Sequence, residues 1–245
     1  MLFRSRGQGG TRVIADALRL VELERAPTNL PPRGNLRIAV VSDLNDALGS
    51  TTYEWQVDSI MQRIPRIWRP DLVVCGGDMV AGQGVSTDVI MRAMWQGFDR
   101  SVTSKFRQAG IPFAFTVGNH DGTRSLPMER RVTREFWRNP AYTPRLAFVD
   151  STNYPAYYSF RQDSVFVVSW DASSDVITPA NLAWLQTQFS SPLARAAKMR
   201  LLVGHMPLYS IAQERDAPGN LLSNNEVLRK VLEVLRVKEI GRAHV

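Results

Sequence analysis

The sequence contains almost no cysteine and no long uninterrupted apolar run. Cys75 is the only cysteine among 245 residues, which excludes an internal disulfide framework and suits a small buried thiol in a reducing, cytoplasmic compartment. Residues 11–25 have apolar side chains at helical spacing, but charges at positions 16, 19, 22 and 24 interrupt them. This segment therefore fits neither a signal-peptide core nor a membrane span. Internal repeats and low-complexity tracts are also absent.

The chain is basic, yet it has no concentrated basic stripe. It carries 30 Lys and Arg against 23 Asp and Glu, a net charge of +7. This balance suits an anionic substrate and permits nucleic acid, but the arginines are scattered and not interleaved with aromatic residues. Nucleic-acid binding is therefore not indicated. A hydrophobic content of 44% at this length predicts one domain with a sizeable core.

Apolar runs and helical periods alternate along most of the chain. Strands are predicted at residues 36–41, 72–75 and 113–117, with helices near 53–68 and 89–109 between them. This βαβαβ order predicts a parallel sheet. After a helix at 128–138, strands at 147–149, 157–160 and 165–170 are expected to begin a second sheet. The remaining elements are a lead-in helix at 11–25, a helix at 179–189 capped by Thr178, a strand at 199–203 and a helix at 224–238.

Four short polar segments follow predicted strands and carry the chemistry of the chain. The carboxyl ends of parallel strands meet at one edge of a sheet, so these side chains are expected to converge. Mixed carboxylate, amide and imidazole donors suit Mn, Fe or Zn. The segments are Ser42-Asp43-Leu44-Asn45, Gly76-Gly77-Asp78, Gly118-Asn119-His120-Asp121 and Gly204-His205.

These donors would provide most of a site for two neighbouring ions. Asp78 could bridge the pair, Asp43 could hold the first ion, and Asn119 and His205 could hold the second. Two such ions would clamp a phosphoryl group and lower the pKa of an attacking water.

Two further side chains of the third segment suggest acid catalysis. His120 is then a candidate proton donor to the leaving oxygen, and Asp121 could orient its imidazole.

Each segment has a purely structural explanation when taken alone. Gly-Gly-Asp is a common strand-ending turn, Ser42-Asp43 resembles a helix cap, and a lone buried histidine is more often satisfied by hydrogen bonds than bound to metal. If the segments were only structural, four unrelated turns would have placed these donors after four strands in this order. Such a coincidence is improbable, so the combination favours a metal site.

The order and spacing of these segments resemble the calcineurin-like metallophosphoesterase superfamily, with Gly118-Asn119-His120-Asp121 as the most specific match. The resemblance covers about residues 35–209. It implies an α/β fold, an αββα sandwich of two mixed sheets flanked by helices, whose last strands are missing here. It also implies hydrolysis of small phosphate mono- or diesters at a dinuclear centre, with a metal-bridging hydroxide as nucleophile and His120 as leaving-group acid.

The chain departs from the pattern that this resemblance implies in its first motif and in its distal segment, and one further position disfavours a subtype. Asn45 stands where the first motif usually has histidine, and its oxygen favours Mn over tight Zn binding. With residues 49–53 this motif resembles a bacterial branch of the superfamily. Ala81 replaces the tyrosine of purple acid phosphatases, which disfavours an iron-tyrosinate centre. The distal Gly-His-x-His segment, which supplies one ligand to each metal, has no counterpart after His205.

Both ends of the chain resemble translated sequencing adapters. Residues 2–5 and 240–245 correspond to opposing library adapters read in frame, so His244 is not counted as a ligand. The expected organisation is an adapter-derived tip at 1–5, the lead-in helix and linker at 6–34, an incomplete catalytic domain at 35–238 and a second tip at 239–245. Ordinary terminal segments are the alternative.

Two functions remain open from the sequence. The first is a metal-dependent phosphoesterase, with Arg124 as a further phosphate contact unless it is simply a solvated loop arginine. The second is a catalytically impaired metal-binding or interaction module on the same fold, suggested by Asn45 and the missing distal histidines. Both remain compatible if the chain as given belongs to the second class and a longer parent belongs to the first.

The source DNA distinguishes truncation from loss. We expect its reading frame to continue past Lys238 into a Gly-His-x-His segment, because the adapter resemblance begins just after that residue. Resequencing the original locus tests this expectation. A natural stop codon at that point, or a continuation without these histidines, would favour the impaired module.

Overall fold

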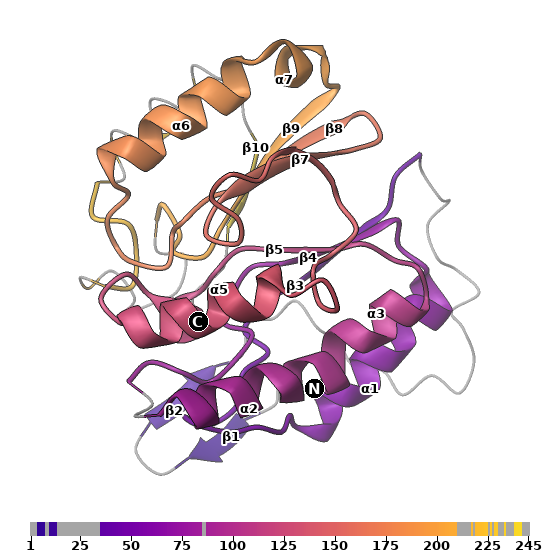
Figure 1. Ribbon diagram of the computed structural model, residues 1–245, viewed down its shortest axis with the longest axis vertical. Helices are drawn as coiled ribbons and strands as arrows, with labels where there is room; N and C mark the ends of the chain where they lie inside the picture. The colour runs from indigo at the N-terminus through magenta and orange to yellow at the C-terminus, as the bar shows by residue number, and fades with distance from the viewer. Residues whose placement is uncertain are drawn as a thin grey trace.

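The computed structural model describes residues 4–7, 10–13, 35–84 and 87–209, and, beyond these, 217, 219–224, 226, 228, 229, 233 and 238–241. Two sheets face each other in the middle of the molecule, and helices cover their outer sides (Figure 1). This is the αββα sandwich with two sheets that the sequence predicts. Within the described residues, no helix is both long and apolar enough to cross a membrane.

The first sheet has three parallel strands in the order β3 (Ile38–Val41), β4 (Leu72–Cys75) and β5 (Phe113–Phe115). The central strand β4 is buried along its whole length, because the second sheet covers one of its faces and helices cover the other. These helices are α1 (Trp55–Arg63), α2 (Asp88–Phe98), α3 (Ser104–Gln108) and α5 (Pro127–Arg138), with π-helical turns at Ile64–Trp68 and Asp99–Thr103.

The second sheet has the order β10-β9-β8-β7-β6. Strands β6 (Ala147–Asp150), β7 (Tyr158–Gln162) and β8 (Val165–Ser169) are antiparallel neighbours, whereas β8, β9 (Met199–Gly204) and β10 (Lys238–Gly241) run parallel. Alternate residues of β8 join different cores: Val165 and Val167 pack with the first sheet, while Phe166 and Val168 pack toward α6 (Pro179–Ser190). The short helix α7 (Pro192–Ala196) follows α6.

Hydrogen bonds from buried side chains fix the two sheets against each other. The Tyr158 hydroxyl on β7 donates to the Phe115 carbonyl at 2.6 Å and accepts from the Phe115 amide at 2.9 Å. Ser169 donates to the same carbonyl, and Thr116 donates to the Trp170 carbonyl, each at 2.9 Å. Burial raises the pKa of Tyr158, so its hydroxyl stays protonated and remains a donor. The end of β5 is thereby aligned with the end of β8.

Most of the predicted elements are confirmed, including the Thr178 cap, whose side chain accepts from the Asn181 amide. Two expectations are wrong in part. Residues 11–13 belong to β2 (Gly10–Val13), which pairs with β1 (Arg4–Gly7), and Lys238 belongs to β10 rather than to a helix. The β-branched Thr11 and Val13 favour an extended backbone despite the helical spacing of the apolar residues. Residues 14–25 lie outside the described part, as does most of 224–237; four described positions there are helical, at 226, 228, 229 and 233.

Candidate metal centre

The polar segments after β3 and β4 are joined by their backbones. The Asp43 amide donates to the Gly77 carbonyl at 3.0 Å, and the amides of Leu44 and Asn45 donate to the Asp78 carbonyl at 3.0 and 3.2 Å. Asp43 and Asp78 both have positive φ angles, of 56° and 51°. Such a conformation is unfavourable for residues with a Cβ and is typically retained where a side chain must be aimed at a site.

Side-chain atoms of His205, Asn119 and the buried Asp78 lie close together. His205 Nδ1 lies 2.8 Å from the Gly76 carbonyl, which can only accept, so Nδ1 carries the proton and Nε2 of the neutral ring carries a lone pair. Nε2 lies 2.8 Å from Asn119 Oδ1 and 3.3 Å from Asp78 Oδ1. Atoms this close need a hydrogen or a cation between them, which a second ring proton, a rotated Asn119 amide or a metal ion would supply. The donor set therefore fits a divalent metal, and the Gly76 carbonyl fixes the ring orientation that such a ligand needs.

The glycines of these motifs leave room that a side chain would fill. A Cβ on Gly118 would lie 2.2 Å from Asp78 Oδ1, and one on Gly77 would lie 2.6 Å from His205 Nδ1. Gly77 also has a φ of +100°, a conformation that favours glycine. Close approach of the backbone to the donors therefore requires glycine at both positions.

His120 lies next to this group at the partly exposed rim. Its amide donates to Asp78 Oδ1 at 3.0 Å, while its ring Nδ1 lies 3.3 Å from the Gly82 carbonyl. Nε2 is 4.0 Å from Asp78 Oδ2, beyond a hydrogen bond, and 19% of the side chain is exposed. The ring therefore presents Nε2 toward the site while a backbone carbonyl holds its other nitrogen.

Asp121 does not orient the His120 ring, contrary to the expectation from the sequence. Its Oδ1 accepts from the amides of Met79 and Val80 at 2.7 and 3.0 Å, and its Oδ2 accepts from the Gly118 amide at 2.7 Å. Burial raises the pKa of Asp121 to about 7, with the Asp78 carboxylate adding to the increase and the hydrogen bonds of Gly118 and Val80 opposing it. Asp121 thus positions the two loops that carry Asp78 and Asn119.

The donors expected for a first ion are less gathered. Asp43 Oδ2 accepts from the Ser42 hydroxyl at 2.6 Å, and Asn45 is half-buried. Among the described residues, no three His, Cys, Asp or Glu side chains are arranged to hold an ion. A metal site here would therefore need amide oxygens as well as carboxylates and imidazole.

The Arg124 side chain forms hydrogen bonds that hold two loops together. Its guanidinium donates to the Asp171 carboxylate at 3.3 Å and to the Val176 carbonyl, which ties two loops together. A phosphate contact at this position stays a prediction.

Two contributors to the site were not predicted from the sequence. The Gly82 carbonyl holds the His120 ring, and Glu129 accepts from the amides of Gln83 and Gly84 at 3.0 and 2.8 Å. A backbone carbonyl leaves no trace in residue type. Glu129 looks like an ordinary acidic residue in the first turn of α5, although it is 1% exposed.

The sequence matches the calcineurin-like phosphoesterase family over residues 36–245. The chain belongs to this family. Two solved phosphatase structures share its fold at low sequence identity. One is the purple acid phosphatase PPD1 from seeds of yellow lupin (Lupinus luteus), with a TM-score of 0.59 and 14% identity over 84% of this chain and 37% of that one. The other is a dimetal phosphatase from Danio rerio, with a TM-score of 0.51 and 12% identity over 81% and 77%.

These likenesses define the fold of the phosphoesterase domain and not its substrate. The chain spans little more than a third of the length of the lupin enzyme. No curated protein matches the sequence. Ala81, which we expect from the sequence to take the position of the purple acid phosphatase tyrosine, is a buried apolar side chain.

The buried Asp121 predicts a pH-dependent stability of the metal-stripped protein. Between the unfolded pKa of 3.8 and the folded pKa of about 7, the folded chain holds a proton that the unfolded chain has lost. The free energy of unfolding should therefore fall by about 2–4 kcal/mol as the pH rises from 4 to 7. Urea denaturation at several pH values measures this decrease.

The variant Asp121→Asn is the control, because its side chain does not titrate. We expect a flatter pH dependence, even though loss of the acceptor for Gly118 lowers overall stability by about 1–3 kcal/mol. Parallel pH profiles for the two proteins would contradict the assignment to Asp121.

Proposed function

We propose that this chain is a metal-dependent phosphohydrolase that cleaves small phosphate mono- or diesters with a pair of divalent ions. The observation that supports this most directly is the convergence of His205 Nε2, Asn119 Oδ1 and Asp78 Oδ1, with the other ring nitrogen of His205 held by the Gly76 carbonyl. Membership of the phosphoesterase family gives the reaction class. The net charge of +7 suits an anionic substrate.

We assign five residues to two ions. His205 and Asn119 would hold the second ion, Asp43 and Asn45 the first, and Asp78 would lie between them. Four of these five ligands contribute oxygen, two from amides and two from carboxylates, so we favour Mn over Fe or Zn. When bound, the pair would polarise the phosphate oxygens and lower the pKa of the attacking water.

His120 would act on the leaving group. The Gly82 carbonyl holds Nδ1, so the protonated ring directs its Nε2 proton toward the site. As the water oxygen bonds to phosphorus, the bond from phosphorus to the ester oxygen breaks, and Nε2 gives its proton to that oxygen. The backbone bond between the His120 amide and Asp78 keeps this acid beside the proposed bridging carboxylate.

A catalytically impaired metal-binding module is the second candidate. It is favoured by the Asp43 carboxylate, which accepts from Ser42 and lies in a site where three acidic or imidazole ligands are not gathered among the described residues. Binding of one Mn ion per chain with no turnover of any ester would support this candidate over the enzyme.

Exchange of His205 should weaken metal binding selectively. In His205→Gln the rigid lone pair beside Asn119 and Asp78 is lost, so we expect Mn affinity measured by calorimetry to fall at least tenfold. His120→Gln removes the same ring from the rim and is the matched control, with affinity within about threefold of the wild type. Equal Mn affinities in all three proteins would mean that a proton, and not a metal, holds the group together.

Exchange of His120 should affect substrates according to their leaving group. An alkyl phosphate leaves as a strongly basic alkoxide that needs protonation, so His120→Gln should lower its kcat by about 10²–10⁴. A nitrophenyl phosphate has a stable leaving anion, so the kcat for this ester should fall much less. Malachite-green and absorbance assays with Mn measure the two rates.

Asp78→Asn should abolish turnover of both esters, which provides a reference for complete loss. An equal loss on both esters in His120→Gln would point to a structural role for the ring instead of acid catalysis.

A further inference from the structure

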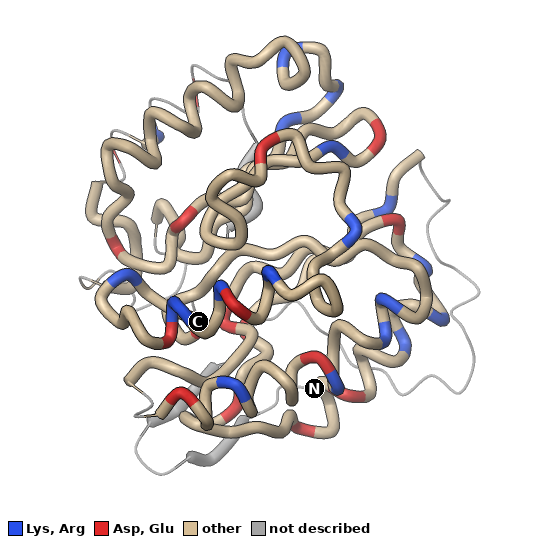
Figure 2. The backbone as a smooth tube through the Cα atoms, viewed as in Figure 1, with Lys and Arg blue, Asp and Glu red and all other residues tan. Residues whose placement is uncertain are grey.

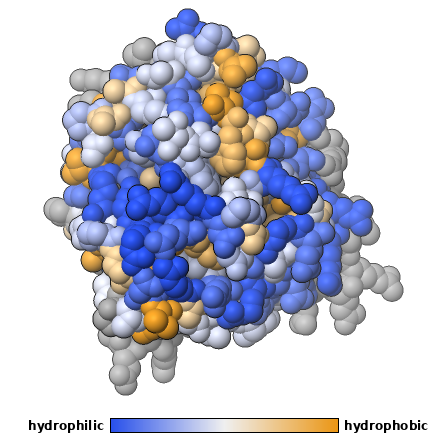
Figure 3. Space-filling view, viewed as in Figure 1, coloured by the Kyte–Doolittle hydropathy of each residue, from blue (hydrophilic) through white to orange (hydrophobic). Residues whose placement is uncertain are grey.

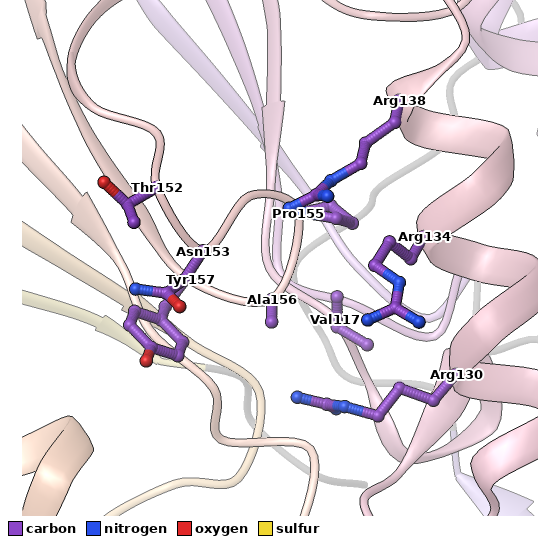
Figure 4. A pocket seen from close by; sticks show the side chains of 9 residues that line it. All are labelled: Val117, Arg130, Arg134, Arg138, Thr152, Asn153, Pro155, Ala156 and Tyr157. Carbon is purple, nitrogen blue, oxygen red and sulfur yellow. The ribbon is translucent and has the colours of Figure 1, made fainter.

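A cavity outside the metal centre is lined by three arginines of one helix face. Arg130, Arg134 and Arg138 lie four residues apart on α5 and face the loop between β6 and β7 across a space of about 220 Å³ (Figure 4). The loop contributes Asn153 and Tyr157 as further polar groups. This volume is below that of pockets for drug-sized ligands and suits a small group.

The cavity has an excess of positive charge. None of its lining residues is acidic. Arg130 donates to the Asp171 carboxylate, which Arg124 also contacts, so two arginines share one negative charge. Arg138 is held by a neutral group, the Tyr154 carbonyl, at 2.8 Å. Like charges four residues apart destabilise a helix, so an anion between them would relieve repulsion.

Arg134 is the least committed of the three. With the described residues it forms no ion pair or hydrogen bond, and Figure 4 shows its guanidinium extending into the cavity between those of Arg138 and Arg130. The other arginines of α5 behave differently: Arg131 pairs with Asp88 and Glu135 on the side of α2. Figure 2 shows these basic positions recurring along α5, and Figure 3 shows hydrophilic side chains gathered over this helix.

The cavity and the metal centre lie at the same edge of the sandwich. Val117 lines the cavity and precedes Asn119 by two residues. The Cα atoms of Val117 and Asn119 are therefore at most about 7 Å apart. Arg130 also donates to the Gly122 carbonyl at 3.0 Å, at the end of the short helix α4 (Asn119–Gly122). From the second sheet, Tyr158 pairs with Ser169 at the end of β8, beside the strand that leads to His205.

We propose that this cavity binds a second anionic group, a phosphate or a carboxylate, of the ester that is hydrolysed at the metal centre. The inference rests on the proposed function, because it assigns the cavity to the same substrate. Guanidinium groups bind phosphate and carboxylate through paired hydrogen bonds, and Arg134 has its donors available. The enzyme would therefore prefer esters with two negative groups separated by a short span.

Direct binding tests the cavity without catalysis. Metal-stripped protein is titrated with inorganic phosphate in a calorimeter, for the wild type, Arg134→Gln and Arg100→Gln. Arg100 is an exposed arginine of the second π-helical turn, outside the cavity, so it controls for loss of one charge. We expect phosphate affinity to fall about tenfold or more in Arg134→Gln and to stay within about twofold in Arg100→Gln. Equal affinity in all three proteins overturns the proposal.

Kinetics link the cavity to the substrate. With Mn present, the ratio of kcat/KM for a hexose bisphosphate to that for the matching hexose monophosphate is measured in the same three proteins. We expect the ratio to fall about tenfold in Arg134→Gln and to be unchanged in Arg100→Gln. An unchanged ratio in Arg134→Gln overturns the assignment to substrate. If the wild type hydrolyses neither ester, the proposed function fails, and the phosphate titration still decides whether the cavity is an anion site.

Discussion

The alignment of the two sheets is the constraint on which the candidate site depends. Asn119 follows a strand of the first sheet and His205 follows a strand of the second, yet their side chains meet at 2.8 Å. No strand pairing joins β5 to the second sheet in the described chain, so the alignment comes from side chains. The Tyr158 hydroxyl binds both backbone groups of Phe115, and the hydroxyls of Ser169 and Thr116 add two further bonds. Because these groups are buried, a lost partner would leave an unsatisfied polar atom and shift the balance against this arrangement.

Hydrogen bonding to buried polar groups also explains why so many of them are tolerated at the edge of the sheets that carries the candidate site. Asp78, Asp121 and His205 are all nearly inaccessible to solvent. Asp121 is stabilised by three backbone amides, and the His205 ring is stabilised by the Gly76 carbonyl. Asp78 Oδ1 accepts from the His120 amide and lies beside His205 Nε2, and the negative charge of this carboxylate is buried there. A bound cation would compensate it, and in its absence the folded chain keeps protons that it would otherwise lose.

The sequence predicts the strands and the placement of the donors because both follow from short-range patterns. An apolar run ending in Gly-Gly-Asp or Gly-Asn-His-Asp identifies a strand and the polar turn after it, and parallel pairing then brings the turns together. The role of Asp121 could not be predicted, because a carboxylate that accepts backbone amides has the same residue type as one that orients an imidazole. The Gly82 carbonyl and the buried Glu129 were missed for the same reason. The strand at residues 10–13 was missed because its pairing partner, and not its own periodicity, decides its conformation.

Helix α5 connects these parts, which explains its unusual surface. Glu129 holds the amides of Gln83 and Gly84, in the loop that also supplies the carbonyl for His120. One residue later, Arg130 joins Gly122 to Asp171 and so connects the end of β5 with the end of β8. The next turns present Arg134 and Arg138 to the cavity. One rigid helix supports the loop beside His120, links the two sheets and lines the arginine cavity. These three features therefore keep a fixed relation to one another. In the proposed enzyme, the helix would determine which esters reach His120 in a productive position, while the strand ends would determine which ions bind.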